Sequence, residues 1–298
     1  RRQPQAPALM CGEEVFSHQQ LLAAAERLAG WLRGQGMGPG RRVALELPRG
    51  PALITGILGV LLSGASYLAV DPVYPEARRR QMLELARPAL VLKALPEELD
   101  ELADELPELE RRQEAYLMAT SGSGGSPRAI PIWHSHLDHY LETLPRALGL
   151  VSEDRALHTA SFSFSSSVRQ LLAPLTSGAC VVLARSHELA DPQALLGLMQ
   201  QQRVSLSDWI PSYAQHVLQA WPEELTLPHW RLLVMASEPL PVALARAWNE
   251  RAPQLQLWNL YGQTETCGIV CLHPVDGHEQ GTWVPLGTPL PGWEAGVF

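Results

Sequence analysis

The sequence lacks any long apolar run. A membrane-spanning helix needs about 20 consecutive apolar residues. The longest apolar stretches, residues 54–62 and 171–184, are interrupted by glycine, proline or serine. A basic start followed by an apolar run and a small-residue cleavage site is also missing. We therefore expect a soluble protein that is not secreted and works in the cytoplasm.

Cysteine and positive charge are scarce as well. Four cysteines in 298 residues fit a reduced compartment better than a disulfide scaffold. A formal net charge of -8 argues against a nucleic-acid-binding surface, which needs clustered lysine and arginine. The dense charge run at residues 97–112 is mostly acidic, and we interpret it as a solvated helix or connector.

Two of the cysteines have histidines nearby and could be drawn as a zinc site. Cys267 and Cys271 precede His273 and His278. This spacing is not a common structural-zinc pattern, so we favour buried or half-buried thiols and predict no metal there.

Short β-branched runs alternate with longer stretches of helical period along the whole chain. Helices are predicted at residues 21–35, 52–63, 76–86 and 135–149, and strands at 42–47, 65–70, 89–92 and 115–119. The alternation continues through residues 167–175, 180–183, 192–202, 206–210, 213–220, 232–235, 242–251 and 255–259. This pattern predicts an α/β fold with mostly parallel sheets sandwiched by helices.

A loop rich in glycine and hydroxyl residues follows the strand predicted at 115–119. It runs from Thr120 to Arg128 and contains neither a Walker nor a dinucleotide-binding pattern. Backbone N–H groups and hydroxyls of such a loop can converge on a phosphate. The alternative is a flexible linker, which the same composition also favours.

A second polar segment follows the strand predicted at 255–259. It reads Asn-Leu-Tyr-Gly-Gln-Thr-Glu at residues 259–265. An amide can contact a base edge, a tyrosine ring can stack on it, a threonine hydroxyl can hold a phosphate, and a glutamate can bind Mg²⁺. The alternative is a β-α turn with Thr264 or Glu265 at a helix start.

These two segments, in this order, resemble those of the adenylate-forming (ANL) superfamily. Residues 63–72, 74–78 and 86–89 are similar to the branch of nonribosomal peptide synthetase adenylation domains. The resemblance extends from about residue 16 to 289. It implies that residues 1–298 form the amino-terminal core of such a domain, with two interleaved α/β lobes and a phosphate loop at 116–135.

The resemblance also implies a role for each matching residue and for two cofactors, ATP and Mg²⁺. The catalytic residues would be Thr264, Glu265 and His134, with Glu265 as the metal ligand. The nucleotide-binding residues would be Thr120, Ser121, Gly122, Ser123, Gly125, Arg128, Ser237, Glu238, Asn259, Tyr261 and Gly262. The implied reaction joins a carboxylic acid to AMP, releases pyrophosphate, and later passes the acyl group to coenzyme A or to the phosphopantetheine of a carrier protein.

The chain departs from this pattern in the phosphate loop and at the acid pocket. Gly124 replaces a hydroxyl residue, and Arg128 and Ala129 replace lysine and glycine. Ser165 follows Phe164 where domains that activate α-amino acids have an aspartate. Because a buried ammonium needs a counter-ion, we expect a hydroxy, keto, aryl, fatty or β-amino acid instead.

The same alignment assigns a set of residues to the acid pocket. They are Phe164, Ser165, Ser166, Arg169, Trp209, Val234, Ala236, Leu260, Gly268 and Ile269. Arg169 could pair with a second anionic group on the substrate or lie on the solvent side of its helix. Trp209 could line the pocket or simply pack, and we favour packing.

Residues 1–298 do not include the small mobile carboxy-terminal domain that the resemblance would place next, so we expect them to be a fragment or subdomain of a longer protein. We therefore expect the chain alone to bind nucleotide weakly and to adenylate slowly. Two alternatives stay open: a catalytically inactive, adenylation-like scaffold domain of a megasynthase, and an unrelated nucleotide-binding α/β protein.

Overall fold

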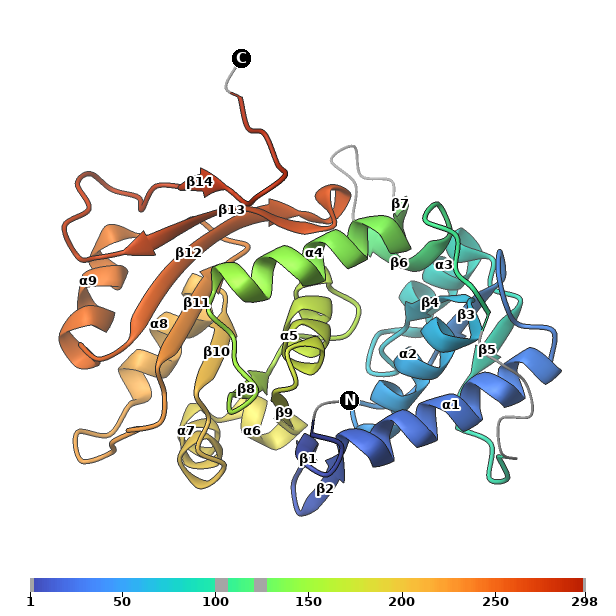
Figure 1. Cartoon of the computed structure of the whole chain (residues 1–298). Helices are drawn as coiled ribbons and strands as arrows, with labels where there is room; N and C mark the ends of the chain where they lie inside the picture. The colour runs from blue at the N-terminus through green and yellow to red at the C-terminus, as the bar shows by residue number, and fades with distance from the viewer. Residues whose placement is uncertain (1–2, 100–106, 121–127, 297–298) are drawn as a thin grey trace. The chain divides into compact units, whose positions relative to one another are not determined.

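The computed structural model describes residues 3–99, 107–120 and 128–296, which fold as an α/β protein with mostly parallel sheets, as predicted (Figure 1). The chain divides into two compact units. Unit 1 comprises residues 1–9, 14–140 and 161–168, and unit 2 comprises residues 10–13, 141–160 and 169–298.

Unit 1 contains, among the described residues, a five-stranded sheet in the order β5-β3-β4-β6-β7. The strands β3 (Arg42–Leu45), β4 (Ser66–Ala69), β5 (Leu90–Leu92) and β6 (Glu114–Thr120) are parallel, and β7 (Arg128–Trp133) is antiparallel to β6. Its helices are α1 (His18–Gly34), α2 (Pro51–Ser63) and α3 (Glu76–Ala86). A hairpin of β1 (Pro7–Cys11) and β2 (Glu14–Ser17) precedes α1.

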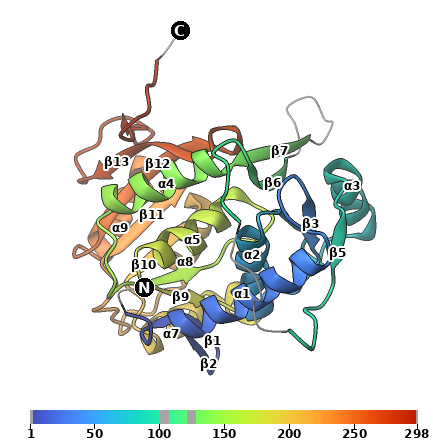
Figure 2. The same ribbon diagram turned by 45° about the vertical axis from the view of Figure 1, so that its right-hand side comes forward.

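Local sequence signals explain how α1 begins and how closely it packs on α2. Ser17 and Gln20 form a capping box at its first turn. The helices lie side by side in Figures 1 and 2. A Cβ on Gly59 of α2 would lie 2.7 Å from Leu28 Cδ2, so glycine permits this close approach.

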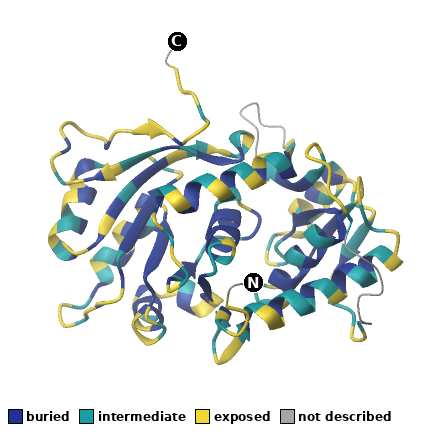
Figure 3. Ribbon diagram, viewed as in Figure 1, coloured by how far each residue is buried: buried dark blue, intermediate teal, exposed yellow. Residues whose placement is uncertain are grey.

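Unit 2 contains a larger sheet, in which five neighbouring strands are parallel. They follow the order β12-β11-β10-β8-β9, with β8 (Arg155–His158), β9 (Cys180–Leu183), β10 (Leu206–Trp209), β11 (Leu232–Ala236) and β12 (Gln256–Gln263). The strands β13 (Gly268–Val275) and β14 (Thr288–Pro289) continue it in antiparallel pairing. In Figure 3 strands β8 to β11 are drawn almost wholly as buried, as expected for a sheet covered on both faces.

Different helices cover the two faces of this sheet. Helix α5 (Ser165–Thr176), from residue 169 onward, and the carboxyl half of α4 (His134–Ala147) lie on one face. The opposite face packs against α7 (Pro192–Gln201), α8 (Pro211–Ala220) and α9 (Val242–Arg251), with the short α6 (Ser186–Ala190) before α7. Four tryptophans form the centre of this second face, namely Trp209, Trp221, Trp230 and Trp248.

The observed elements match most predicted ones, with two instructive differences. Residues 128–133 were expected to be loop but form β7, an edge strand that tolerates Pro131 because one side of an edge strand needs no ladder hydrogen bonds. The strand predicted at 255–259 continues to Gln263 and turns back as β13. The acidic run at 97–112 lies partly outside the described residues.

No helix within the described ranges combines the length and apolar character needed to cross a membrane.

Candidate functional site

Three of the candidate pocket residues of unit 2 lie toward the carboxyl ends of two adjacent parallel strands. Val234 and Ala236 lie on β11, and Ala236 pairs in register with Leu260 of β12. Val234 also pairs with Asp208 of β10. Since residues in register on parallel strands share a face, these four side chains lie on one side of the sheet. Open α/β sheets place their ligand crevices at this end of the strands.

Trp209 lies on the opposite face. It is in register with Met235, which pairs with Asn259, and its ring centroid is 5.4 Å from that of Trp230. Only 3% of Trp209 is exposed. Trp209 thus packs among the other tryptophans of this face, on the side of the sheet opposite to Val234 and Ala236.

The neighbour that does share the face of Val234 is Asp208, which the sequence analysis did not select. A shift of one residue along a strand moves a side chain to the other face. Asp208 could have been identified because its side chain lies on the same face of the sheet as that of Val234. Finding this requires the register between β10 and β11, which the sequence alone does not give.

Asp208 is paired with Arg169 of α5. Arg169 Nε donates to Asp208 Oδ2 and Nη2 donates to Oδ1 at 2.9 Å, which is a bidentate geometry. The two side chains are 7% and 9% exposed. Of the two alternatives for Arg169, the one that places it on the solvent side of its helix is wrong, because Arg169 is buried. Its guanidinium is paired with a carboxylate of the protein itself.

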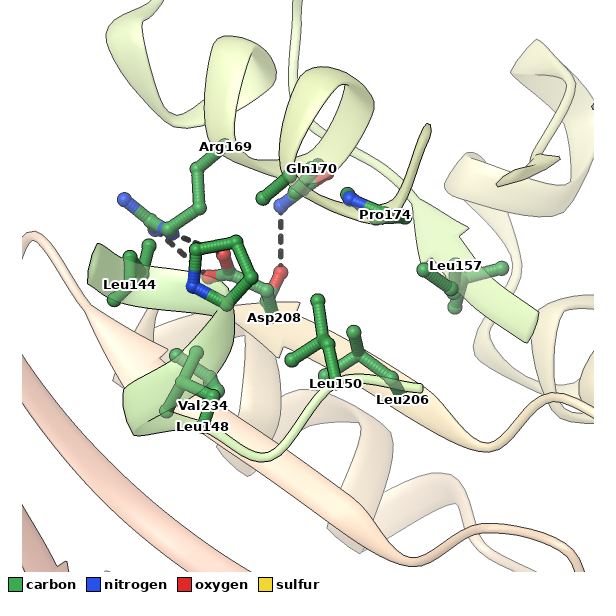
Figure 4. A pocket seen from close by; sticks show the side chains of 13 residues that line it. Leu144, Leu148, Leu150, Leu157, Arg169, Gln170, Pro174, Leu206, Asp208 and Val234 are labelled. Carbon is green, nitrogen blue, oxygen red and sulfur yellow. Dashed lines mark hydrogen bonds and ion pairs between the residues drawn. The ribbon is translucent and has the colours of Figure 1, made fainter. Parts of the chain in front are cut away.

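A small cavity lies against this pair, within unit 2 (Figure 4). Its volume is about 20 Å³, and apart from the pair and Gln170 it is lined by apolar side chains from α4, α5, β8, β10 and β11 and from the residues around Leu150. Gln170 Nε2 donates to the backbone oxygen of Asp208 at 2.7 Å. Its Oε1 accepts from the N–H groups of Thr159 and Ala160, so Gln170 connects α5 to the ends of β8 and β10.

The segment 259–265 forms the end of β12 and a tight turn rather than a β-α connection. A 3₁₀ turn at Thr264–Thr266 leads directly into antiparallel β13, so the alternative of a helix start is wrong. A Cβ on Gly262 would lie 1.9 Å from the backbone oxygen of Gly268, which excludes any larger residue without rearrangement. The register shifts between Tyr261 and Gly262, as in a β-bulge.

The side chains of this hairpin differ in exposure. Tyr261 is 44% exposed, and Glu265 is exposed in the 3₁₀ turn beside half-buried Thr264. Asn259 is buried, and its Nδ2 donates to the backbone oxygen of Pro285 at 2.9 Å. This hydrogen bond to Pro285 fixes the orientation of the Asn259 side-chain amide.

Two further pocket candidates, Gly268 and Ile269, are buried at the start of β13. They pair with Gln263 and Gly262 respectively across the β12–β13 turn. They therefore belong to the same hairpin as Tyr261.

Ser237 and Glu238 follow β11. Ser237 has a φ of 72°, a left-handed conformation that is uncommon for a residue with a side chain. The carboxylate of Glu238 accepts from the N–H of Ser212 at 2.9 Å and from its hydroxyl at 3.0 Å. Because Ser212 lies in the first turn of α8, this contact stabilises the amino-terminal end of that helix.

In unit 1, the candidate phosphate loop is only partly visible. Thr120 ends β6 and pairs with Arg128, the exposed first residue of β7. Ser121, Gly122, Ser123 and Gly125 lie outside the described residues. The predicted strand before the loop is confirmed, as β6.

His134 begins α4 and is buried. Its Nε2 has no hydrogen-bond partner among the described residues. Burial lowers the pKa of His134, although Asp138 acts in the opposite direction. A neutral imidazole is thus favoured at neutral pH.

Phe164 is 55% exposed just before α5, whereas Ser165 and Ser166 are half-buried in its first turn. Among the candidate pocket residues, these three belong to unit 1 and the remaining ones to unit 2.

The zinc alternative receives no support. Cys267 and Cys271 are buried, and burial raises the pKa of the Cys271 thiol. Within residues 3–99, 107–120 and 128–296, no group of three or more His, Cys, Asp or Glu side chains could hold a metal ion.

Comparison with known proteins gives a consistent family match. The family described as AMP-binding enzyme matches residues 1–114 and 93–298. Tyrocidine synthase 3 of Brevibacillus parabrevis is 32% identical over 309 residues, which cover 96% of this chain and 5% of that protein. The chain thus spans a small part of this relative.

Solved structures agree with the fold. A nonribosomal peptide synthetase, FmoA3 (S1046A), matches with a TM-score of 0.88 and 26% identity, covering 97% of this chain and 33% of that one. The AMPPNP-bound form of the same protein matches equally well. The amino-terminal subdomain of NpsA from Klebsiella oxytoca matches with a TM-score of 0.87 and 24% identity over 97% of this chain and 77% of that one.

Proposed function

Since the chain belongs to the family of AMP-binding enzymes, we propose that it binds ATP and a carboxylic acid and joins them as an acyl-adenylate. The observation that carries this proposal is the family match along nearly the whole chain. It agrees with the gathering of Val234, Ala236 and Leu260 at the carboxyl ends of parallel strands. The relatives are peptide synthetases, which supports an adenylation role within a longer assembly.

For the nucleotide, the proposal relies on the β12–β13 hairpin and on the residues flanking the glycine-rich loop. Tyr261 has an exposed ring suited to stacking on adenine, and the amide of Asn259 is suited to its amino group. Thr264, Thr120 and Arg128 would contact phosphates, together with Ser121, Gly122, Ser123 and Gly125. The AMPPNP-bound form of FmoA3 supports ATP as the nucleotide.

Glu265 fits Mg²⁺ by its chemistry. It offers an exposed carboxylate, and Mg²⁺ is usually held by one or two carboxylates plus substrate phosphates rather than by a protein cage. When bound, the ion would neutralise phosphate charge. The protein itself would contribute alignment of the acid carboxylate with the α-phosphorus and electrostatic stabilisation of the phosphate charge, which carry most of the catalysis in phosphoryl transfer.

For the acid, we propose a substrate other than a standard α-amino acid. Ser165 offers no carboxylate for an α-ammonium group. Asp208, whose side chain shares the face of Val234, is already paired with Arg169. A hydroxy, keto, aryl, fatty or β-amino acid is therefore favoured.

The acyl group would then pass to a thiol. Similarity to peptide synthetases favours the phosphopantetheine of a carrier protein, with coenzyme A as the other acceptor. His134, buried at the start of α4, would act near the phosphate loop as a neutral imidazole.

The decisive experiment is ATP-pyrophosphate exchange by the full-length protein with a panel of acids, combined with mass spectrometry of the acyl-AMP. Exchange with non-α-amino acids and a matching acyl-AMP mass is the expected result. Calorimetry with ATP and Mg²⁺ adds a second test. Neither exchange nor nucleotide binding would leave a scaffold domain as the better description, and preference for a common α-amino acid would refute the substrate class.

A further inference from the structure

An open groove of about 610 Å³ lies at the amino edge of the five-stranded sheet of unit 1. It is lined by residues just before or at the start of β3, β5 and β6, and by Trp133 at the end of β7. Because β7 is antiparallel to β6, its end lies at the same edge of the sheet as the start of β6. Thr120, which precedes the candidate phosphate loop, lies at the other end of β6.

The charged residues of this groove are unevenly distributed. The segments before β3 and β5 contribute Arg41 and Arg87, next to Arg42 at the start of β3, and no acidic residue. The acidic lining residues all belong to the segment 108–114, which also contributes Arg112. The β3–β5 side of the groove is therefore positive, although the net charge of the chain is -8. Charge complementarity favours an anionic group there.

Arg42 is neutralised within the protein and forms a fixed part of the groove. Its Nε and Nη2 donate to the two carboxylate oxygens of Glu114 at 2.9 and 2.8 Å, and its Nη1 donates to the backbone oxygen of Ala86 at 3.0 Å. The hydroxyl of Ser66 donates to the same carboxylate at 2.6 Å. This network joins the starts of β3, β4 and β6, so the groove has a rigid base.

Arg41, Arg87 and Arg112 differ from Arg42 in having no such partner. All three are exposed, and within residues 3–99, 107–120 and 128–296 their side chains make neither a hydrogen bond nor an ion pair. Arg87 caps the carboxyl end of α3 with a φ of 46°, a left-handed conformation in which glycine is usual. The end of the helix therefore does not explain why an arginine stands at this position. These guanidinium groups are available for carboxylates from outside the chain.

Trp133 gives the other side of the groove an aromatic surface. It is 37% exposed at the end of the edge strand β7. Since neighbouring strands lie about 4.8 Å apart, the edge from β5 to β7 spans about 19 Å, which is the length of about six extended residues.

The composition of the groove favours a peptide over a small ligand. Tryptophan and arginine are enriched among the residues that contribute most to protein–protein binding. Most of the lining residues are exposed, whereas a small-molecule site buries most of its ligand.

We propose that this groove docks an acidic peptide segment of a protein partner, with carboxylates of the segment on Arg41 and Arg87 and an aromatic side chain on Trp133. The inference does not depend on the proposed adenylation, because it uses no residue assigned to the nucleotide or to the acid.

The test measures the binding of fluorescein-labelled peptides of about six residues to the full-length protein by fluorescence anisotropy. The probe peptide has glutamates at one end and a phenylalanine at the other, and it is made in both chain directions. Control peptides carry lysines in place of the glutamates, or alanine in place of the phenylalanine. The variant Arg41→Gln/Arg87→Gln removes two charges from the groove. The matched control Arg80→Gln/Arg146→Gln removes two charges from exposed arginines outside it.

The acidic peptide should bind the wild type in one of its two directions, and its affinity should fall as salt is added. The groove variant should bind it about fivefold more weakly, and the control variant should stay within about twofold of the wild type. Trp133→Ala should weaken binding by about tenfold, and should make the phenylalanine and alanine peptides equivalent. Thermal unfolding shows that each form is folded, and Trp133→Leu replaces the alanine variant if that variant does not fold.

The inference is overturned if the acidic peptide binds the wild type no better than the lysine peptide does. An equal loss in the groove variant and in the control variant would also overturn it, because net charge rather than the groove would then decide. Unchanged binding by the Trp133 variant would reject the aromatic contact. Pyrophosphate that bound more tightly than the peptide, with the same dependence on Arg41 and Arg87, would identify a site for a small anion instead.

Discussion

Two arginine–aspartate pairs lie at opposite ends of the same parallel strands in unit 2. Arg169 and Asp208 meet toward the carboxyl ends, and Arg231 and Asp154 meet at the amino ends. Each arginine makes two hydrogen bonds to its aspartate. The two pairs are chemically alike, so their surroundings must account for any difference in role.

The amino-end pair makes further hydrogen bonds to the backbone and to a serine side chain. Asp154 also accepts from the N–H of Val151 and the hydroxyl of Ser205, and Arg231 donates to the backbone oxygen of Gly149. Asp154, Ser205 and Arg231 each directly precede a strand, β8, β10 and β11 respectively. This network joins the starts of three adjacent strands, whereas the Arg169–Asp208 pair borders a cavity. The amino-end pair therefore links three strands, and the carboxyl-end pair links α5 to β10 beside a cavity.

The largest effect is expected from breaking the carboxyl-end pair one partner at a time. Arg169→Met or Asp208→Leu leaves a buried charge unpaired and should cost about 3–5 kcal/mol of unfolding free energy, while the double variant should be close to wild type. Urea denaturation measures all three. A double variant as unstable as the sum of the singles would show that the two residues do not act as a pair.

The amino-end pair should respond less strongly to a single change. Arg231→Met should cost about 1.5–3 kcal/mol, because Asp154 keeps its bonds from Val151 and Ser205 and because the Arg231 side chain is 35% exposed. Arg146→Met, which removes an exposed pair with Glu142, serves as a control and should cost less than about 0.5 kcal/mol. A loss of unfolding free energy in Arg231→Met as large as that in Arg169→Met would contradict the expected difference between the two pairs.

At the carboxyl ends of the strands, replacing Tyr261 should lower the affinity for ATP without changing the free energy of unfolding. Tyr261→Ala should weaken ATP binding by about 1–3 kcal/mol through loss of stacking on the base, and Tyr261→Phe should retain most of it. Calorimetry measures the affinity. Trp283→Ala removes another exposed aromatic ring of unit 2 and should leave the affinity unchanged. Equal losses in both alanine variants would indicate a general surface effect rather than a base contact.

The smallest effect concerns acid stability at the amino ends. Burial alone would raise the pKa of Asp154, but hydrogen bonds from Arg231, Val151 and Ser205 outweigh it, so this pKa lies below its usual range. The stabilisation is present above the unfolded pKa of about 3.9 and is lost as the pH falls through the folded value. The gap in unfolding free energy between wild type and Asp154→Asn should therefore narrow between pH 7 and pH 3. A gap that stays constant over this range would contradict the assignment.

The fold was predictable wherever local signals agreed. The predicted bounds of α3, β9 and α9 coincide with the observed ones, because proline, glycine and periodicity mark their ends. The strands β7 and β13 escaped prediction since both follow turns whose chemistry also fits a loop or a helix start. Pairing with a neighbouring strand, rather than local preference, makes them strands.

The site was predictable as a set of motifs but not as a set of contacts. The motif around Tyr261 and the strand before Thr120 follow from residue types in order along the chain. The pairing of Arg169 with Asp208 could not be predicted, because these two residues are 39 positions apart in the sequence.

By itself, the sequence determined the α/β class, the order of most elements and the family. It did so through apolar periodicity and short motifs, which act over a few residues. Only the tertiary structure decided that Asp208 rather than Trp209 shares a face with Val234, and that Arg169 is neutralised within the protein. The reason is physical: the face of a strand residue has meaning only relative to the register of its neighbours, and that register is fixed by packing across the whole sheet.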